Sequence, residues 1–437
     1  MSVKVVKFGG SSLADANQIK KAAAIIRADE SRKYAVVSAP GKRFSDDIKV
    51  TDMFYACYDA AKKGEDFSDI FAKIKERYNG IIKDLGLTLN LDREFAIIEG
   101  CLLGNAGRDY AASRGEYLNA VIIAEYLGFD FVDAADVVVF SESGEFMLDK
   151  TISLISQRLE NSNCAVIPGF YGMREGGTIK TFSRGGSDVT GSLVARAVNA
   201  EIYENWTDVS GFLIADPRIV CNAEVIETIT YTELRELAYM GAGVLHEDAI
   251  FPVRTAGIPI NIRNTNEPEA KGTMIVAETD EESRNIITGI AGKKGFCAIN
   301  IEKDMMNSEV GFGMKVLDVL REFNISFEHL PSGIDTMSII LSSSCIEGRE
   351  EDILNRIRKA VNPDKLEIEH GLALLAVVGR GMRSTRGTAA RTFAALAHAR
   401  VNVKMIDQGS SELNIIIGVM EEDFEKATSA IYDCFVN

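Results

Sequence analysis

Cysteine and histidine are scarce in this 437-residue sequence, and neither is clustered. The seven cysteines are scattered and never spaced Cys-x-x-Cys, which argues against a disulfide framework and against a zinc site. The four histidines show no His-Glu-x-x-His spacing or similar ligand pattern. We therefore expect reduced, structural thiols and no metal held by a cluster of side chains.

Long hydrophobic runs and an excess of positive charge are lacking as well. No segment approaches the roughly 18 apolar residues of a membrane span. Residues 1–10 lead directly into a strand-like run, without the longer apolar segment and cleavage site of a secretory signal. The 48 basic and 64 acidic residues give a formal charge of −16, which repels nucleic acid and anionic membranes. We expect a cytoplasmic protein that binds neither.

What is present is an ordinary globular composition, 46% hydrophobic and 26% charged, in a chain long enough for two or three folded units. Up to about residue 285, short β-branched runs alternate with helical patterns. The runs lie at 3–8, 34–38, 164–168, 201–205 and 258–262, and the helical patterns at 17–27, 52–127 and 190–198. This alternation predicts a mainly parallel sheet sandwiched by helices.

The remaining residues contain an internal repeat, after an acidic stretch at 278–283 that suits a boundary. A shift of 76 positions aligns residues 311–341 with 387–417 without a gap, so that Gly311 matches Gly387. Both copies read as strand, glycine, amphipathic helix, two strands and a second helix. We expect two small α+β modules with helices on one face of an antiparallel sheet, although any two such segments can be slid into partial register.

The first motif that suggests chemistry is Lys7-Phe-Gly-Gly-Ser-Ser12, at the end of a predicted strand and before a helix that Ser12 and Asp15 can cap. Glycines there let backbone N–H groups approach a phosphate beside a helix N-terminus, and Lys7 can neutralise its charge. The simpler alternative is a tight turn with a solvated lysine. Neither Gly-x-x-x-x-Gly-Lys-Ser/Thr nor Gly-x-Gly-x-x-Gly occurs.

Three further motifs are weaker when taken singly. The arginine in Thr181-Phe-Ser-Arg-Gly-Gly-Ser-Asp188 is suited to binding a carboxylate. A plain loop with an exposed arginine and a helix-capping Ser or Asp explains the same residues. Two ordinary turns would explain Asn205-Trp-Thr-Asp-Val-Ser-Gly211 and the following Asp216-Pro-Arg218. Charged side chains on a solvent-exposed helix face would explain Ser113-Arg-Gly-Glu-Tyr117. No Gly-x-Ser-x-Gly occurs, so hydrolase chemistry is unsupported.

Together these motifs resemble the aspartate kinases, ATP-dependent members of the amino-acid kinase superfamily. Val36-Val-Ser-Ala39 belongs to the same ordered set, and Val378-Gly-Arg-Gly-Met382, Ala389-Ala-Arg391 and Gln408-Gly-Ser-Ser-Glu412 resemble the second of the family's two ACT modules. The resemblance implies an amino-acid kinase domain over 1–285 and ACT (βαββαβ) modules at 295–366 and 367–437. It also implies that the strand at 286–294 completes the second module, and that no homoserine dehydrogenase is fused.

The activity implied by the resemblance is transfer of the γ-phosphoryl group of Mg-ATP to the side-chain carboxylate of L-aspartate. The product, 4-phospho-L-aspartate, opens the route to lysine, threonine, methionine and diaminopimelate. Carried over by motif, the catalytic residues are Lys7 and Asp188, and the substrate-binding residues are Ser38, Thr51, Glu116 and Arg184. The ATP-binding residues are Lys7, Gly9, Gly10, Ser11, Ser187, Thr207, Asp208 and Arg218, with Mg²⁺ held mainly by the phosphates.

Some positions depart from the family pattern. The loop before Thr51 is unusual, which leaves its register ambiguous. Leu213 stands where an aromatic residue often packs on the nucleotide, and Asn266 where some members carry lysine. Arg263 is a candidate to supply that missing charge.

The ACT pair resembles an allosteric sensor that forms between subunits of a homo-oligomer, a dimer or a dimer of dimers. The implied effector pocket uses Met305, Ser308, Phe312, Ser326, Phe327, Glu328 and Ser332, with a strand starting near 324–328. Lysine is the preferred effector, partly because Glu328 can accept its ammonium. Val310 and Ile334 differ from well-known lysine-sensitive members, so threonine, alone or with lysine, stays open.

Two other readings compete with this one. The first is another kinase of the superfamily, acting on glutamate, acetylglutamate, carbamate or UMP, although those enzymes lack the ACT tail. The second is a non-catalytic amino-acid sensor, which has no evident need for Lys7, Glu116, Arg184 and Asp188.

Overall fold

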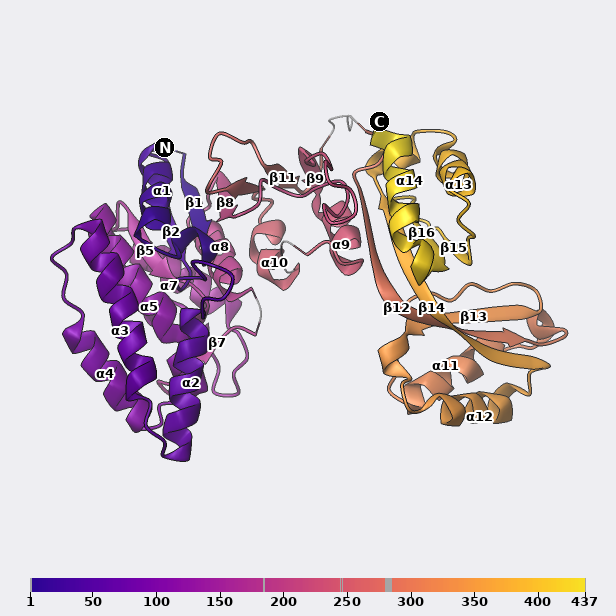
Figure 1. Ribbon diagram of the computed structural model, residues 1–437, viewed down its shortest axis with the longest axis horizontal. Coiled ribbons are helices and arrows are strands. Elements are labelled where there is room, and N and C mark those ends of the chain that lie inside the picture. The colour runs from indigo at the N-terminus through magenta and orange to yellow at the C-terminus, as the bar shows by residue number, and fades with distance from the viewer. Residues whose placement is uncertain (1, 184, 244, 246, 280–284, 437) are drawn as a thin grey trace. The chain divides into compact units, whose positions relative to one another are not determined.

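The computed structural model describes residues 2–183, 185–243, 245, 247–279 and 285–436 (Figure 1). The chain forms two compact units. The first comprises Met1–Phe212, Val225–Tyr231 and Gly243–Thr279. The second comprises Leu213–Glu224, Thr232–Ala242 and Asp280–Asn437, so two short segments from the first 285 residues pack with the C-terminal part of the chain.

The first unit is built on an eight-stranded sheet in the order β3-β5-β2-β1-β8-β10-β11-β9 (Figure 1). All neighbouring pairs are parallel except β10 and β11. The strands are β1 (Lys4–Phe8), β2 (Arg32–Val37), β3 (Asp130–Phe131), β5 (Ala165–Pro168), β8 (Ile202–Thr207), β9 (Thr228–Thr230), β10 (Ile260–Asn264) and β11 (Thr273–Val276). A smaller sheet contains β4 (Val139–Phe140), β6 (Tyr171–Arg174) and β7 (Ile179–Thr181). The predicted mainly parallel sheet is confirmed.

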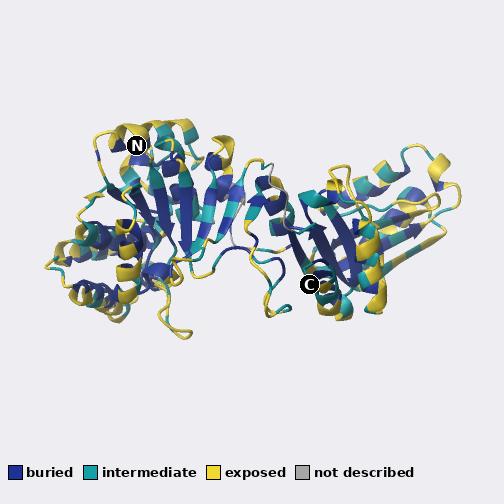
Figure 2. Ribbon diagram, turned by 90° about the horizontal axis from the view of Figure 1, so that it is seen from above, coloured by how far each residue is buried: buried dark blue, intermediate teal, exposed yellow. Residues whose placement is uncertain are grey.

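One face of the large sheet is covered by the first five helices, whose apolar sides form a core with strand residues such as Val6, Phe8 and Val37. These helices are α1 (Ala16–Arg27), α2 (Val50–Lys63), α3 (Ser68–Leu85), α4 (Asp92–Leu103) and α5 (Arg108–Leu127). Figure 2 shows the resulting pattern of buried strands and helices with exposed outer sides. The prediction that 52–127 is mostly helical is confirmed.

The other helices of the first unit centre on α8 (Gly186–Ala197), which contacts β1 and β2. Around it lie α7 (Leu148–Leu159) and α10 (Glu247–Thr255), while α6 (Ala134–Val137) is a single turn. Helix α8 begins four residues earlier than the pattern suggested, after Gly185 in the left-handed region (φ 55°). Ser187 and Asp188 therefore lie in its first turn, where short polar side chains are favoured.

The second unit contains a five-stranded antiparallel sheet in the order β13-β12-β14-β16-β15. Its strands are β12 (Gly289–Glu302), β13 (Thr336–Ser342), β14 (Lys365–Val378), β15 (Met405–Asp407) and β16 (Asn414–Met420). Its helices are α9 (Tyr231–Tyr239), α11 (Phe312–Glu322), α12 (Glu350–Val361), α13 (Thr388–His398) and α14 (Phe424–Val436). The repeat is visible in α11 and α13, which are 11 residues long, start 76 positions apart, and follow Gly311 and Gly387 with φ of 80° and 85°.

Strands β12 and β14 each run through both repeats. Residues 289–294 of β12 pair with 373–378 of β14, beside β16, and Ile290 N also donates to Ile214 O. Residues 296–302 of β12 pair with β13 on one side and with the first part of β14 on the other. Two long strands therefore hold the modules in one continuous sheet.

The prediction of a strand that starts near residues 324–328 is wrong. That segment is irregular, and its neighbourhood contributes only isolated bridges, between His329 and Ile340 and between Ser332 and Met337. Pro331 lies between the two bridges and has no N–H to donate, which prevents a continuous ladder.

Candidate active site

Lys7, the penultimate residue of β1, lies in a buried polar cluster. Its Nζ lies 2.6 Å from Asp188 Oδ1 and donates to Asn205 Oδ1 at 3.3 Å. Asn205 Nδ2 donates to the same Asp188 oxygen at 2.8 Å. Lys7 and Asn205 are register partners on the parallel strands β1 and β8, so their side chains share one face of the sheet. Two strands and the first turn of α8 thus fix one ammonium group in place.

The glycine turn after β1 presents backbone rather than side chains. The Gly9 N–H donates to Trp206 O (3.0 Å), which extends the β1–β8 pairing. Gly10 O accepts from Leu13 N (3.1 Å) and Gly41 N (2.8 Å). Among the described residues the N–H groups of Gly10 and Ser11 have no protein acceptor. Two free donors beside an ammonium suit an anion such as a phosphate.

The backbone of Gly41, in the loop after β2, packs directly against this turn. A Cβ added to Gly41 would lie 2.6 Å from the Gly10 carbonyl carbon and 2.8 Å from Ser11 N, closer than any real Cβ contact. Only glycine therefore allows the chain after β2 to approach the turn.

The buried carboxylate of Glu116 on α5 forms the other part of the site. Its residue is 6% exposed, and its Oε2 has no hydrogen-bond partner among the described residues. Burial raises the pKa of Glu116 to about 8, although the Ala39 N–H partly offsets the effect. A buried carboxylate with an unused oxygen is a candidate partner for a ligand ammonium.

Ser38 and Thr51 lie next to Glu116. A Cβ on Gly115 would meet Ala39 Cβ at 2.8 Å and Thr51 Oγ1 at 3.8 Å, so the segment after β2 and the start of α2 both touch α5 there. Asn119 Nδ2 donates to Ser38 O at 2.7 Å. The structure thus brings together three of the four predicted substrate-binding residues. The fourth, Arg184, lies outside the described residues.

The predicted nucleotide-binding residues are divided between the two units. Thr207 ends β8, and its hydroxyl donates to Asp208 Oδ1 at 3.1 Å. Ser187 packs on the loop after β5, because a Cβ on Gly169 would lie 2.6 Å from Ser187 Oγ. Arg218 belongs to the second unit, where its exposed guanidinium pairs with Asp216 at 2.6 Å.

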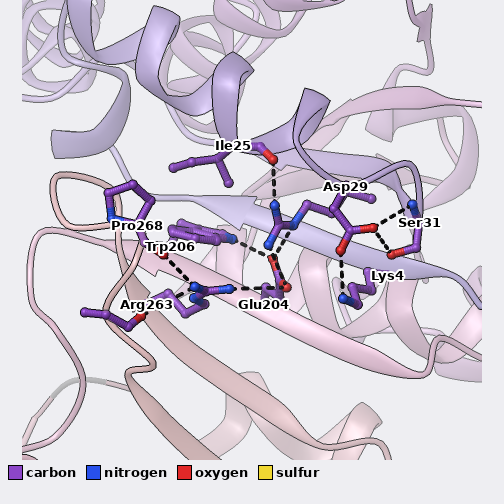
Figure 3. Close-up of polar contacts among 10 residues, drawn as sticks. Lys4, Ile25, Asp29, Ser31, Glu204, Trp206, Arg263 and Pro268 are labelled. Atoms are coloured by element: carbon purple, nitrogen blue, oxygen red, sulfur yellow. Dashed lines mark hydrogen bonds and ion pairs between the residues drawn. The ribbon is translucent and has the colours of Figure 1, made fainter.

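The opposite face of the sheet holds a separate charged cluster around Glu204 (Figure 3). Its carboxylate accepts from Arg32 Nε and Trp206 Nε1 at 2.8 and 2.9 Å, and Arg263 lies 3.9 Å away. Arg263 also donates to Pro268 O at 2.6 Å and lies over the Trp206 ring. Since Arg263 pairs in register with Trp206 and Lys7 with Asn205, the guanidinium and the Lys7 ammonium are on opposite faces.

The chain is similar to known proteins over nearly its whole length. The model of the amino acid kinase family matches residues 2–264, and the model of an ACT domain matches 375–435. Aspartokinase 3 of Bacillus subtilis is 40% identical over 448 aligned residues, covering 99% of this chain and 98% of that protein. The chain belongs to the aspartokinase family. The predicted family and the predicted enzyme class, a phosphotransferase, are confirmed.

Solved structures of aspartokinases have the same fold. The Clostridium acetobutylicum aspartate kinase, described as an allosteric enzyme, matches with a TM-score of 0.91 and 51% identity over the whole of both chains. Escherichia coli aspartokinase III, in complex with aspartate and ADP, matches with a TM-score of 0.73 and 25% identity over 99% of both chains. The predicted kinase fold with C-terminal ACT modules is thereby confirmed.

Several residues of this aspartokinase site were missed by sequence reasoning. Asn205 bridges Lys7 and Asp188, and Gly41 supports the glycine turn. Lys21 of α1 lies outside this site, in the cavity lined by Arg32, Trp206 and Arg263, and donates to Asn266 Oδ1 at 2.8 Å. Asn205 opens a motif noted in the sequence, but its contact with Lys7 follows from strand register, and the contacts of Gly41 and Lys21 follow from packing between distant segments.

The predicted effector residues lie in the second unit on two adjoining loops and a nearby segment. Met305 N donates to Asp335 Oδ1 and Asn307 N donates to Ile334 O, so the loop that carries Ser308 adjoins the turn that begins at Ser332. The side chain of Phe312 is buried in the core of the first module. Ser326 and Phe327 are exposed.

Glu328 already has a protein partner. Its carboxylate accepts the hydroxyl of Tyr239, and this bond is the main reason why the pKa of Tyr239 is raised to about 12. A ligand ammonium at Glu328 would therefore share or displace the tyrosine hydroxyl.

Neither side-chain metal clusters nor membrane helices occur in the described part of the chain. No three His, Cys, Asp or Glu side chains among those residues come together in a way that would hold a metal ion. None of the described helices combines the length and apolar character that crossing a bilayer requires.

Proposed function

We propose that the enzyme transfers the γ-phosphoryl group of ATP to the side-chain carboxylate of L-aspartate, giving 4-phospho-L-aspartate and ADP. The observation that carries the proposal is the buried Lys7 ammonium, held by Asp188 and Asn205, together with the N–H groups of Gly10 and Ser11, which bond to no acceptor among the described residues. Phosphoryl transfer between two anions needs this kind of fixed positive field more than covalent chemistry. The aspartate and ADP bound in the Escherichia coli relative support the same pair of substrates.

At the phosphate end, Lys7 neutralises charge on the transferring oxygens, and Asp188 orients its ammonium. Gly10 and Ser11 donate backbone hydrogen bonds, while Gly9 contributes by leaving the turn open. Mg²⁺ would be carried mainly by the nucleotide phosphates, and it would neutralise charge that develops on them. The backbone donors, the lysine and the nearby Asp208 suit such a Mg-nucleotide. Ser187, Thr207 and Asp208 complete the proposed nucleotide contacts within the first unit, while the nucleotide role of Arg218 stays a prediction from the sequence.

At the acceptor end, Glu116 pairs with the ammonium of aspartate through its unused oxygen, and Ser38 and Thr51 hydrogen-bond nearby. Arg184 clamps an aspartate carboxylate. Arg184→Ala should therefore mainly raise KM for aspartate, and an unchanged KM would refute the clamp.

The deciding experiment is an assay of ADP release with Mg-ATP across a panel of acceptors. L-Aspartate should give turnover that depends on its concentration, with an acyl phosphate product that hydroxylamine traps. Glutamate, acetylglutamate, carbamate and UMP should give little. Preference for one of these acceptors would assign another superfamily kinase, and no turnover with any would favour the non-catalytic sensor.

We further propose that the regions 295–366 and 367–437, the latter completed by 286–294, sense an end-product amino acid, while 1–285 carries catalysis. Lysine is the preferred effector because Glu328 and Tyr239 offer a carboxylate and a hydroxyl for an ammonium. Threonine is the alternative. Titrating activity with each amino acid separately tests the assignment, and insensitivity to both would contradict it. We propose that the enzyme is cytoplasmic and that its product feeds lysine, threonine, methionine and diaminopimelate biosynthesis.

We also propose that the enzyme is a homo-oligomer assembled through the ACT modules. The supporting observation is a group of exposed apolar side chains on adjoining loops of the first module: Met305 (70% exposed), Val310 (97%) and Ile334 (70%). Several large apolar side chains on neighbouring loops are typical of a surface that another chain covers.

A further inference from the structure

Arg77 on α3 belongs to no motif, yet its buried guanidinium connects two segments that flank the glycine turn. Its NH2 group donates to Ala14 O at 2.7 Å and to Gly41 O at 2.8 Å. Ala14 directly follows the 3-10 turn Ser11–Leu13, and Gly41 is the residue seated on Gly10. The side chain of Arg77 is only 5% exposed, so these bonds are made without competition from water.

The other end of the guanidinium is fixed by Asp47. Arg77 NH1 lies 2.8 Å from Asp47 Oδ2, and Arg43 binds the same carboxylate through Nε and NH2. The pKa of Asp47 is held well below its usual range, first by the hydrogen bond from Arg43 and further by Arg77, so the carboxylate is charged at every pH at which a kinase is assayed. Both ends of the segment 41–47 are therefore bonded to Arg77 of α3, Gly41 through its carbonyl and Asp47 through its carboxylate.

The bonds form a short path from Arg77 to the phosphate-binding groups. Arg77 holds the carbonyl of Gly41, and the N–H of the same residue donates to Gly10 O. Gly10 and Ser11 in turn carry the two N–H groups that find no acceptor within the described part of the chain. Moving Gly41 by a few tenths of an ångström would press on Gly10, because the two backbones are already in contact.

We propose that Arg77 is a positioning residue for phosphate binding, acting through Gly41 and Ala14 on the turn that carries the Gly10 and Ser11 N–H groups. The inference rests on the proposed kinase function. Donors that are aimed in advance cost no reorganisation when the nucleotide binds, so loosening them should weaken ATP use specifically. Lysine cannot replace the arginine, because its single ammonium lacks the planar fork that reaches a carboxylate and two carbonyls at once.

The test compares Arg77→Lys and Asp47→Asn with Arg43→Gln in the full chain. Arg43 is a matched control, since it shares Asp47 but bonds neither Ala14 nor Gly41. We expect Arg77→Lys to lower kcat/KM for Mg-ATP at least about tenfold while KM for aspartate stays within about twofold. Asp47→Asn should show a smaller effect of the same kind, and Arg43→Gln should stay within about twofold on both measures.

Hydrogen exchange of the segments 8–14 and 40–47 gives a readout that does not depend on activity. Faster exchange in Arg77→Lys than in Arg43→Gln, at matched thermal midpoints, is the expected result. Unchanged ATP kinetics in folded Arg77→Lys, or an equal change in the kinetics of both substrates, would overturn the positioning role. A wild-type chain inactive with aspartate would instead refute the proposed function, and the exchange comparison would still decide whether Arg77 orders the turn.

Discussion

Glu116 shows how burial gives one residue two opposing roles. The carboxylate lies within α5, where desolvation raises its pKa to about 8. A neutral Glu116 suits the folded protein, whereas a charged Glu116 suits the ammonium of aspartate. Ligand binding and folding stability should therefore depend on pH in opposite directions.

Glu116→Gln tests this opposition. In the wild type, kcat/KM for aspartate should rise with pH up to about 8 as the carboxylate ionises, and the variant should lose this limb and at least about tenfold in kcat/KM. Because the pKa of Glu116 in the folded protein lies above its ordinary value of 4.5, the wild type loses stability relative to the Gln variant as pH rises from about 4.5 through about 8. Thermal midpoints that differ by the same amount at pH 5 and pH 9 would contradict the assignment.

Lys7→Ala removes the central cation of the site. Turnover should fall by at least about 100-fold, because a preorganised donor to the transferring group is lost, while KM for aspartate stays nearly unchanged. Lys4→Ala is the matched control: Lys4 lies on the same strand but pairs with Asp29 away from the turn, and its loss should leave turnover within about twofold. A modest effect of Lys7→Ala would end its catalytic role.

Individual site residues could be predicted from the sequence where they belong to a short, recognisable motif. Lys7 and Asp188 stand in recognisable motifs, and the structure brings them together. Asn205, Gly41 and Arg77 escaped it because their roles depend on strand register or on contacts between segments far apart in the chain. The pattern showed that a strand and a helix exist, but not which residues face each other across them.

Among the elements, α11 and α13 illustrate how strongly a turn glycine is constrained. Gly311 and Gly387 precede them with φ near 80°, a conformation that costs other residues strain. The 76-residue shift had already aligned these two glycines, so the helix starts were predictable. The irregular segment at 324–328 was not, because its alternating side chains look like those of a strand.

Gly311→Ala should destabilise the second unit by about 1–2 kcal/mol, the usual cost of left-handed backbone for an L-residue. Gly313→Ala, two residues along in α11, should be neutral or stabilising by up to about 1 kcal/mol, because its only close neighbour is the flexible end of Met337. Denaturant titration of both variants measures the difference. Equal stabilities would show that the turn relaxes to a negative φ.

For the whole molecule, the division into units is the feature least accessible from sequence. Residues 213–224 and 232–242 fall within the predicted kinase segment, but they pack with the C-terminal unit. Hydrophobic periodicity indicates that one side of a segment is buried, but it does not indicate which of the two units that side packs against. The predicted fold classes depended on the order of the elements, which the sequence does contain.

Val310→Glu tests the proposed assembly surface. Val310 is 97% exposed on the apolar loops of the first module, so a carboxylate there should cost nothing in the isolated chain but should disfavour pairing. Sedimentation should show a larger fraction of monomer than in the wild type, together with a weaker response to the effector. Ile97→Glu, on an exposed face of α4, is the control and should sediment like the wild type.

The long strand β12 is synthesised well before the segment of β14 with which its first half pairs. Residues 289–294 are made first, and their partner residues 373–378 of β14 emerge about 80 to 90 residues later. At about 5–20 residues per second, the edge formed by 289–294 waits several seconds on the ribosome without its neighbour. During this interval the unpaired backbone groups of the strand edge are open to pairing with another chain.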